Sequence, residues 1–248
     1  MPKVKIDDAE LHYEEAGQGY PILCMPGALG TGRTDFGAQL VAWSSRFRVI
    51  APDPRGFGRS RPPERDFSVD FFSQDARDFA HLMTRLGYKT FHLAGWSDGA
   101  NSAALLAAEF HDRVSKLVIW GGTSYISRED IEGLERIELI SNWSTRMRRT
   151  LEDVYGDSLP SIWNAYCDSF RKRFETFPEI CRLQLHAIRC PTLVLHGELD
   201  PIVPGFHPQI FHDEIPLSEL HLFPFGRHNV HLAQAEEFNR VVLGFLGS

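Results

Sequence analysis

The stretch that decides the fold reads Phe91-His92-Leu93-Ala94-Gly95-Trp96-Ser97-Asp98-Gly99. Its apolar first half is typical of a buried strand, and the run 100–110 that follows is typical of a helix. Glycines at positions 95 and 99 remove the side chains that would collide in a sharp turn between a strand and a helix. The sequence therefore predicts a strand, a tight turn with Ser97 at its tip, and a helix. Taken alone, such a pentapeptide is also compatible with a plain turn of small residues.

The segments on either side alternate between short apolar runs and helical periodicity. A helical pattern over 72–86 stops at Gly87, a residue typical of helix ends, and an amphipathic helix is predicted over 231–245. This alternation predicts βαβ units, and hence an α/β fold with a mostly parallel central sheet flanked by helices. The predicted strands occupy 21–25, 47–51, 91–95, 114–120, 191–197 and 219–223.

The pattern changes between residues 124 and 187, where aromatic residues are interleaved with arginines. Trp143 and Trp163 stand among charged residues such as Arg146 and Arg171, which favours surface helices over buried strands. We therefore predict a helical lid inserted between two segments of one core. The predicted division is 1–123 for the first core segment, 124–187 for the lid and 188–248 for the second core segment.

Composition excludes several classes of partner. The 248 residues carry 26 Lys and Arg against 33 Asp and Glu, a net charge of −7, without a long basic run, so we expect no nucleic-acid partner. No stretch approaches the roughly 18 apolar residues of a membrane span. The amino terminus enters a strand-like pattern at once, so neither a signal nor a transit peptide is visible in this chain.

The cysteines favour a reducing, intracellular compartment such as the cytoplasm. They lie far apart and form no C-x-x-C pair. The sequence also contains no H-E-x-x-H motif and no cluster of Cys and His, so we expect neither a metal nor an organic cofactor. The four cysteines are Cys24, Cys167, Cys181 and Cys190.

A serine in a turn of this kind points to covalent catalysis, provided that the chain supplies the partners which a hydroxyl nucleophile needs. These are a base, a carboxylate that orients the base, and donors for the developing oxyanion. The predicted carboxylate is Asp200, which lies on the loop that leaves the strand at 191–197. Glu198 competes with it, but sits in the tight turn directly after the strand. An Asx turn before Pro201 is the alternative role for Asp200.

The predicted base is His228, on the loop between the last strand and the last helix. This position gives the chain order Ser, Asp, His and places the imidazole at the carboxyl end of a strand, where catalytic groups of such sheets gather. His231 is the rival, three residues further on and already within the predicted helix. Most of the eleven histidines, among them His12, His92 and His221 within strands, are interpreted as ordinary core or surface residues.

The predicted oxyanion donors are two backbone N–H groups. One belongs to Asp98, the residue after the nucleophile, and the other to Leu29 on the glycine-rich loop 26–32, with Ala28 as the alternative. Glycines on this loop permit backbone angles that allow close approach to a ligand. The loop lacks the Lys-Ser/Thr ending of a phosphate-binding P-loop, so we favour the oxyanion interpretation.

Four motifs beyond these loops extend the comparison to known families: 53–63 (Asp-Pro-Arg-Gly-Phe-Gly-Arg-Ser-Arg-Pro-Pro), Phe71-Phe72, 118–121 (Val-Ile-Trp-Gly) and 228–232 (His-Asn-Val-His-Leu). With the Ser97 pentapeptide they resemble the α/β-hydrolase superfamily, and within it the biphenyl hydrolase-like family, or valacyclovirases. The resemblance implies a serine esterase acting on α-amino acid esters, with some activity toward homocysteine thiolactone. It also implies triad roles for Ser97, Asp200 and His228, and oxyanion roles for the amides of Leu29 and Asp98. Because the family's mammalian members are associated with mitochondria, the resemblance makes the mitochondrion an alternative to the cytoplasm.

The charge of Asp98 supports part of this expectation independently. Many esterases carry an uncharged residue at this position, whereas a carboxylate beside Ser97 would attract the protonated amine of a small-molecule ester. The alternative is that Asp98 merely stabilises the helix N-terminus. Other functions remain open: a C–C bond hydrolase or lactonase with the same triad, or a non-catalytic receptor. The oligomeric state is not predicted, and a monomer is compatible with the sequence.

Overall fold

The computed structural model describes residues 2–247 and contains, within that range, one eight-stranded sheet in the order β1-β2-β4-β3-β5-β6-β7-β8. The six strands from β3 to β8 are parallel, while β1 and β2 run antiparallel to their neighbours. The predicted mostly parallel sheet is therefore confirmed. The strands are β1 (Lys3–Ile6), β2 (Ala9–Ala16), β3 (Pro21–Met25), β4 (Arg48–Pro52), β5 (Phe91–Trp96), β6 (Val114–Trp120), β7 (Thr192–Gly197) and β8 (Ser218–Phe223).

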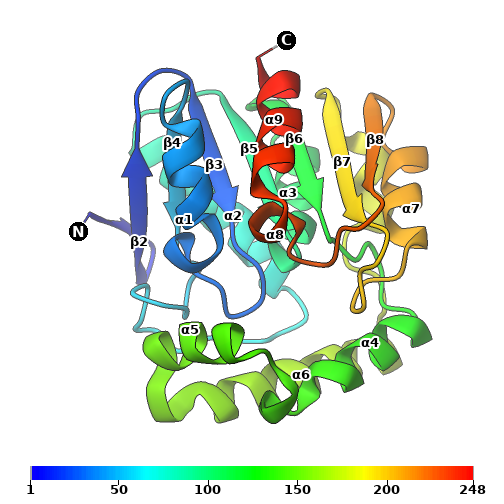
Figure 1. Ribbon diagram of the computed structural model, residues 1–248. Helices are drawn as coiled ribbons and strands as arrows, with labels where there is room; N and C mark the ends of the chain where they lie inside the picture. The colour runs from blue at the N-terminus through cyan, green and yellow to red at the C-terminus, as the bar shows by residue number, and fades with distance from the viewer. Residues whose placement is uncertain (1, 248) are drawn as a thin grey trace.

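Helices cover both faces of this sheet (Figure 1). Buried side chains of α1 (Gly32–Trp43) and α9 (Ala235–Leu246) pack against one face. Those of α2 (Phe71–Arg85), α3 (Asp98–Glu109) and α7 (Phe206–Glu214) pack against the other. The result is a three-layer arrangement in which the parallel strands are buried on both sides.

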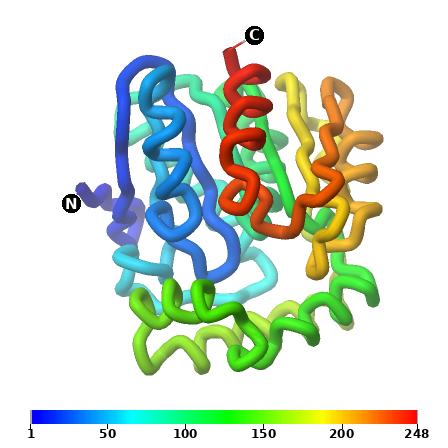
Figure 2. Tube along the Cα trace, viewed as in Figure 1, coloured from blue at the N-terminus to red at the C-terminus, as the bar shows by residue number. Residues whose placement is uncertain are grey.

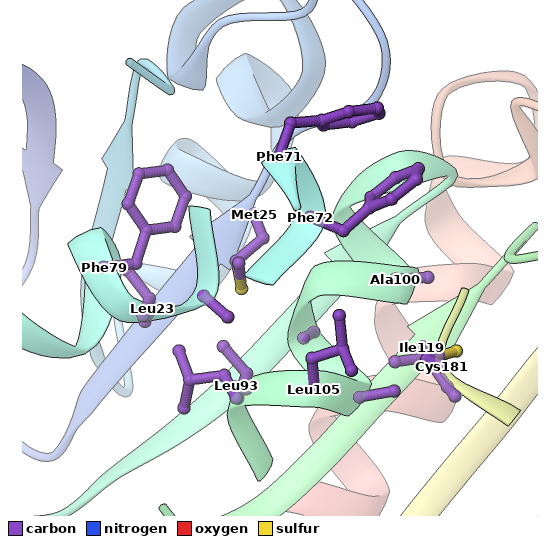
Figure 3. Close-up of a cluster of buried hydrophobic side chains, with 14 of the residues drawn as sticks. Leu23, Met25, Phe71, Phe72, Phe79, Leu93, Ala100, Leu105, Ile119 and Cys181 are labelled. Atoms are coloured by element: carbon purple, nitrogen blue, oxygen red, sulfur yellow. The ribbon is translucent and has the colours of Figure 1, made fainter. Parts of the chain in front are cut away.

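The alternation of side chains along the central strands explains why apolar runs form them. In β3, Leu23 and Met25 belong to the cluster under α2 and α3, which Figure 3 shows, whereas Ile22 and Cys24 belong to the cluster under α1 and α9. Successive residues of a strand point to opposite faces, so a strand between two helical layers needs apolar residues throughout.

Between β6 and β7 the chain leaves the sheet and forms three helices, which we call the lid helices: α4 (Arg128–Glu138), α5 (Thr145–Tyr155) and α6 (Leu159–Thr176). Short 3₁₀ segments accompany them at Ile140–Asn142, Gly156–Ser158 and Arg182–Ala187. The lid helices lie across the carboxyl ends of the parallel strands (Figures 1 and 2). We retain the division at residues 123 and 187 as a proposal.

The carboxyl-terminal helix differs from our prediction of one continuous helix over 231–245. It is divided into α8 (Val230–Ala233) and α9, with Gln234 between them at φ −122° and ψ 45°. The break lets α8 direct His231 into the protein, while α9 turns its apolar residue Phe238 toward the sheet. Within residues 2–247, no helix is long and apolar enough to span a membrane.

Candidate active site

Ser97 lies at the tip of a strained turn between β5 and α3, with φ 55° and ψ −124°. A Cβ on Gly95 would lie 2.4 Å from the Gly99 carbonyl oxygen, and a Cβ on Gly99 would lie 1.9 Å from the Met25 carbonyl oxygen. Both positions therefore require glycine. Positive φ at a residue with a side chain costs free energy that surrounding structure must supply, and it is found at functional sites.

The structure brings together the three side chains predicted to act as a unit. His228 Nε2 lies 3.0 Å from Ser97 Oγ, and His228 Nδ1 lies 2.8 Å from Asp200 Oδ2. Asp200 Oδ1 accepts the backbone N–H groups of Ile202 and Val203 at 2.8 and 3.0 Å, which fixes the carboxylate. Asp200 and His228 follow β7 and β8, so parallel strands deliver both loops to the same edge.

The competing carboxylate, Glu198, is exposed and does not contact the imidazole. Its backbone N–H donates to the Phe223 carbonyl oxygen, which holds the residue in the tight turn that follows β7. Asp200 lies two residues further along, and its side chain is 1% exposed. The extra length of loop lets Asp200, and not Glu198, reach back to His228.

Electrostatic coupling between Asp200 and His228 suits the orientation of a base. Burial alone lowers the pKa of His228, but the charge and hydrogen bond of Asp200 outweigh it and raise the pKa above its usual value. Burial raises the pKa of Asp200, but the neighbouring imidazole and two backbone N–H groups hold it below its usual value. Asp200 is therefore ionised at neutral pH and favours the Nδ1–H tautomer of His228.

His231, the rival base, lies inside the protein and is bonded at both ring nitrogens. Its Nδ1 accepts the Trp120 Nε1–H at 3.0 Å, so its Nε2–H donates to the Asp35 carbonyl oxygen at 3.1 Å. Burial lowers its pKa to about 3, so the ring stays neutral. Both nitrogens are engaged away from Ser97, and His231 is a structural histidine.

The predicted oxyanion loop passes directly beside the nucleophile. A Cβ on Gly27 would lie 3.1 Å from Ser97 Cβ, and the Gly30 N–H closes a turn on the Gly27 carbonyl oxygen at 3.0 Å. Leu29 adopts φ 57° within this turn. In the described part of the chain no acceptor contacts the N–H groups of Ala28, Leu29 or Asp98. The assignment of Leu29 and Asp98 as donors stays a prediction, with Ala28 as the alternative.

A cavity of about 100 Å³ separates the serine from the lid. The core contributes polar groups, whereas the lid helices contribute mainly apolar and aromatic ones. No Lys or Arg stands among its lining residues. They are Ala28, Trp96, Ser97, Asp98, Thr123, Asp130, Leu134, Ile137, Met147, Trp163, Tyr166, Phe170, Ile202, Val203 and His228.

Asp98 faces this cavity beside Ser97, and neighbouring groups compensate its charge only in part. The Tyr166 hydroxyl, from α6, donates to Asp98 Oδ1 at 3.1 Å. Burial raises the pKa of Asp98 to about 7, against the opposing effects of the Tyr166 hydrogen bond and the Arg65 charge. Sequence reasoning missed Tyr166, because nothing in its local sequence distinguishes it from the other aromatic residues of the lid.

Cysteines and metal-ligating side chains are the other groups that could carry chemistry. The four cysteines are buried and unpaired. Within residues 2–247, no group of three or more His, Cys, Asp or Glu side chains is arranged to hold a metal ion.

Comparison with known proteins agrees with the fold and with the motifs. A family model described as alpha/beta hydrolase fold matches residues 20–173. The human (Homo sapiens) protein named Serine hydrolase BPHL is 44% identical over 249 residues, which cover 98% of this chain and 85% of that protein. The 2-hydroxy-6-oxononadienedioate/2-hydroxy-6-oxononatrienedioate hydrolase 2 of Pseudomonas putida is 30% identical over 270 residues, covering 96% and 92%.

A solved structure supports the fold alone. A variant of the meta-cleavage product hydrolase from Pseudomonas fluorescens IP01 aligns with a TM-score of 0.84 at 21% identity, covering 100% of this chain and 97% of that one. The observed architecture, the family model and the relatives that align over nearly the whole chain all indicate the same family. The chain belongs to the α/β-hydrolase family, with the biphenyl hydrolase-like serine hydrolases among its relatives.

Proposed function

We propose that this serine hydrolase cleaves carboxylic esters through an acyl-enzyme on Ser97 and prefers esters of α-amino acids. The observation that carries the preference is the Asp98 carboxylate, which lines the same cavity as the Ser97 hydroxyl. A protonated α-amino group lies two bonds from the ester carbonyl carbon, so a carboxylate beside the nucleophile is well placed to bind it. The human and mouse relatives are named as serine hydrolases, which supports the role of Ser97 in the same proposal.

In the proposed mechanism the Ser97 hydroxyl attacks the ester carbonyl while His228 Nε2, 3.0 Å away, accepts its proton. Asp200 holds the imidazole by its Nδ1–H and stabilises the imidazolium that forms. Backbone N–H groups of Leu29 and Asp98 would donate to the oxyanion of the tetrahedral intermediate. His228 then protonates the leaving alcohol, and a water molecule activated by the same imidazole hydrolyses the acyl-enzyme.

Asp98 would take part through the oxygen that Tyr166 leaves available. The Tyr166 hydroxyl holds Oδ1, so Oδ2 can accept from a substrate ammonium group. Burial raises the pKa of Asp98 to about 7, which means that its charge is costly in the free enzyme. A bound ammonium group offsets that cost, because an opposite charge nearby favours the ionised carboxylate. In the free enzyme Tyr166 and Arg65 offset this cost only in part, so a substrate ammonium group would stabilise the Asp98 carboxylate further.

The dimensions of the cavity favour a compact substrate. About 100 Å³ is small beside the roughly 300–1,000 Å³ of clefts that bind drug-sized ligands. Such a space holds an aminoacyl head group, while Trp163 and Phe170 provide apolar surface for its side chain. A bulky alcohol group would have to extend toward the lid helices or displace them.

A C–C bond hydrolase with the same triad is the second candidate, favoured by the relative from Pseudomonas putida. The name of that relative specifies a dienedioate, which carries two carboxylates. The cavity of this chain is lined by Asp98 and Asp130 and by no Lys or Arg. Like charges at close range repel, so we place an amino acid ester ahead of a dianion as the substrate.

Three matched esters test the proposal: phenylalanine methyl ester, its N-acetyl derivative and methyl 3-phenylpropionate. They share the scissile bond and the phenyl group and differ in the charge beside the carbonyl. We expect kcat/KM for the free amine to exceed that of both neutral esters by at least about tenfold, since a buried charge-assisted contact contributes roughly 1.5–3 kcal/mol. Equal values for the three esters would overturn the amino acid preference. Hydrolysis of homocysteine thiolactone, which carries the same α-amino group, is measured alongside them.

A further inference from the structure

We propose that Asp35 is a positioning residue of the hydrolytic site: its buried carboxylate fixes the turn that carries the second oxyanion donor. The inference rests on the roles proposed above for Ser97 and His228. It assigns a task to a buried carboxylate that the triad itself does not use.

The carboxylate of Asp35 is hydrogen-bonded to one end of the turn 27–30, at Gly27, and lies directly against the other end, at Gly30. Its Oδ2 accepts the Gly27 N–H at 2.9 Å, and its Oδ1 accepts the Thr34 hydroxyl at 2.8 Å. A Cβ on Gly30 would lie 1.9 Å from Oδ2, so the far end of the turn lies directly against the same oxygen. Only 7% of the residue is exposed. The turn therefore wraps around one buried carboxylate, from which it cannot move independently.

The turn that Asp35 holds is the one that lies beside the nucleophile. Gly27 approaches Ser97 so closely that a Cβ there would lie 3.1 Å from Ser97 Cβ. Leu29, at φ 57°, is secured from the other side, because its carbonyl oxygen accepts the Tyr155 hydroxyl of α5 at 2.7 Å. Donors stabilise an oxyanion only within a narrow range of distance and direction. Loss of the Gly27 contact would allow the donor N–H to move relative to Ser97.

Asp35 is also connected to the loop that carries the base. Its backbone oxygen accepts the His231 Nε2–H at 3.1 Å, and His231 Nδ1 accepts the Trp120 Nε1–H. His231 lies three residues after His228, so α1, the last residue of β6 and the base loop are joined through one neutral imidazole. His231 therefore links the segment that follows the base to the helix that follows the oxyanion turn.

The charges of Asp35 and His228 affect each other's pKa. Burial raises the pKa of Asp35 to about 7, while the Thr34 and Gly27 hydrogen bonds and the His228 charge oppose this effect. In return the Asp35 charge contributes to the raised pKa of His228. The other ionisable group facing Asp35 with effect on its pKa is Asp53, after β4, which raises it. Tyr155, whose own pKa lies far above neutrality, stays uncharged.

Two variants distinguish the effect of the hydrogen bond between Asp35 and Gly27 from the effect of the Asp35 charge. Asp35→Asn keeps an oxygen that can accept the Gly27 N–H and removes the charge, whereas Asp35→Ala removes both. The probe is a fluorophosphonate, whose phosphoryl oxygen occupies the oxyanion position after it labels the nucleophilic serine. Labelling rates and the kcat and KM for an ester are measured from about pH 5 to 9, the range in which an imidazole base titrates. The melting temperature of each variant is recorded alongside.

We expect Asp35→Ala to slow labelling and lower kcat by about 100-fold, comparable to the loss of one oxyanion donor, with KM changed by less than about threefold. Asp35→Asn should recover most of that loss, leaving about a tenfold decrease. The acid limb of the pH profile of Asp35→Asn should move to lower pH, because removal of a negative charge lowers the pKa of His228. This shift of the pH profile is a result that a purely structural role would not produce.

Asp53→Asn is the matched control. Asp53 is equally buried and accepts two backbone N–H groups, those of Gly32 and Arg59, but does not contact the turn 27–30. Its labelling rate should stay within about threefold of the wild-type rate. The inference is overturned if folded Asp35→Ala is labelled at the wild-type rate, or if folded Asp35→Asn is labelled no faster than Asp35→Ala. An unlabelled wild-type protein overturns the proposed serine chemistry itself, and this inference with it.

Discussion

Replacing Asp98 by asparagine removes a charge from the cavity while nearly preserving the shape of the side chain. An asparagine oxygen can still accept the Tyr166 hydroxyl that now lies 3.1 Å from Oδ1. A carboxylate and an ammonium about 4 Å apart attract by about 4 kcal/mol at an effective dielectric constant of about 20. Desolvation of both groups opposes this attraction, and net values for hydrogen bonds to charged groups are about 1.5–3 kcal/mol. We take about 2 kcal/mol, which is a loss of about 30-fold in kcat/KM.

The assay compares phenylalanine methyl ester with methyl 3-phenylpropionate on wild-type and Asp98→Asn enzyme. The loss should fall on the amine-bearing ester, with the neutral ester changed by less than about threefold. Because burial raises the pKa of Asp98 to about 7, the wild-type preference should grow as pH rises through 7. It should decline again once the substrate's α-amino group loses its proton, which happens below the roughly pH 8 of a peptide amino terminus because the adjacent ester withdraws electrons. Equal losses on both esters, or a preference that does not vary with pH, would refute the reasoning.

The same substitution makes a prediction about stability. Because burial holds the folded-state pKa of Asp98 above its usual value, the folded protein binds a proton more tightly than the unfolded chain does. The ionised side chain therefore destabilises the fold progressively as pH rises from about 4 to about 7. Asp98→Asn should have a higher melting temperature than the wild type at pH 8, but little difference at pH 4. A lower melting temperature at pH 8 would contradict the assignment of Asp98 as a costly buried charge.

The remaining predictions concern three neighbouring positions. Tyr166→Phe removes the hydroxyl donor to Asp98, so the preference for amine-bearing esters at neutral pH should fall about fivefold, and an unchanged preference would contradict the contact. His231→Asn should destabilise the fold by about 2 kcal/mol in urea unfolding while fluorophosphonate labelling persists; complete loss of labelling in folded protein would make it the base. Gly99→Ala places a methyl group against the Met25 carbonyl oxygen and should cost about 3 kcal/mol or prevent folding, and wild-type stability would show that the turn is looser than described.

The tight turn at Ser97 could be predicted from the sequence because the residues that determine it lie next to one another in the chain. Gly95, Ser97 and Gly99 are three positions in one pentapeptide, and the strand before them and helix after them have their own periodicities. The choice of His228 over His231 also came from position, since a loop after the last strand and the interior of a helix are distinguishable by pattern. The structure supports that choice by showing both nitrogens of His231 bonded elsewhere.

The remaining features depend on contacts between residues far apart in the chain. Asp98 and Tyr166 are 68 positions apart, and Asp35 meets His231 across 196 positions. Neither contact leaves a periodic or motif-like signal in a single sequence. The division of the carboxyl-terminal helix at Gln234 was missed for the same reason, since the direction of α8 is set by the buried partners of His231. Local pattern predicts elements, whereas these contacts arise only when the elements pack.

The measurement that tests the central claim most directly is labelling by a fluorophosphonate followed by mass spectrometry of the peptide that contains Ser97. We predict that the wild-type protein gains one phosphonyl group on Ser97, and that folded Ser97→Ala gains none and does not hydrolyse any of the three esters. Labelling of folded Ser97→Ala at the wild-type rate, or a folded wild-type protein that resists the probe, would contradict the account.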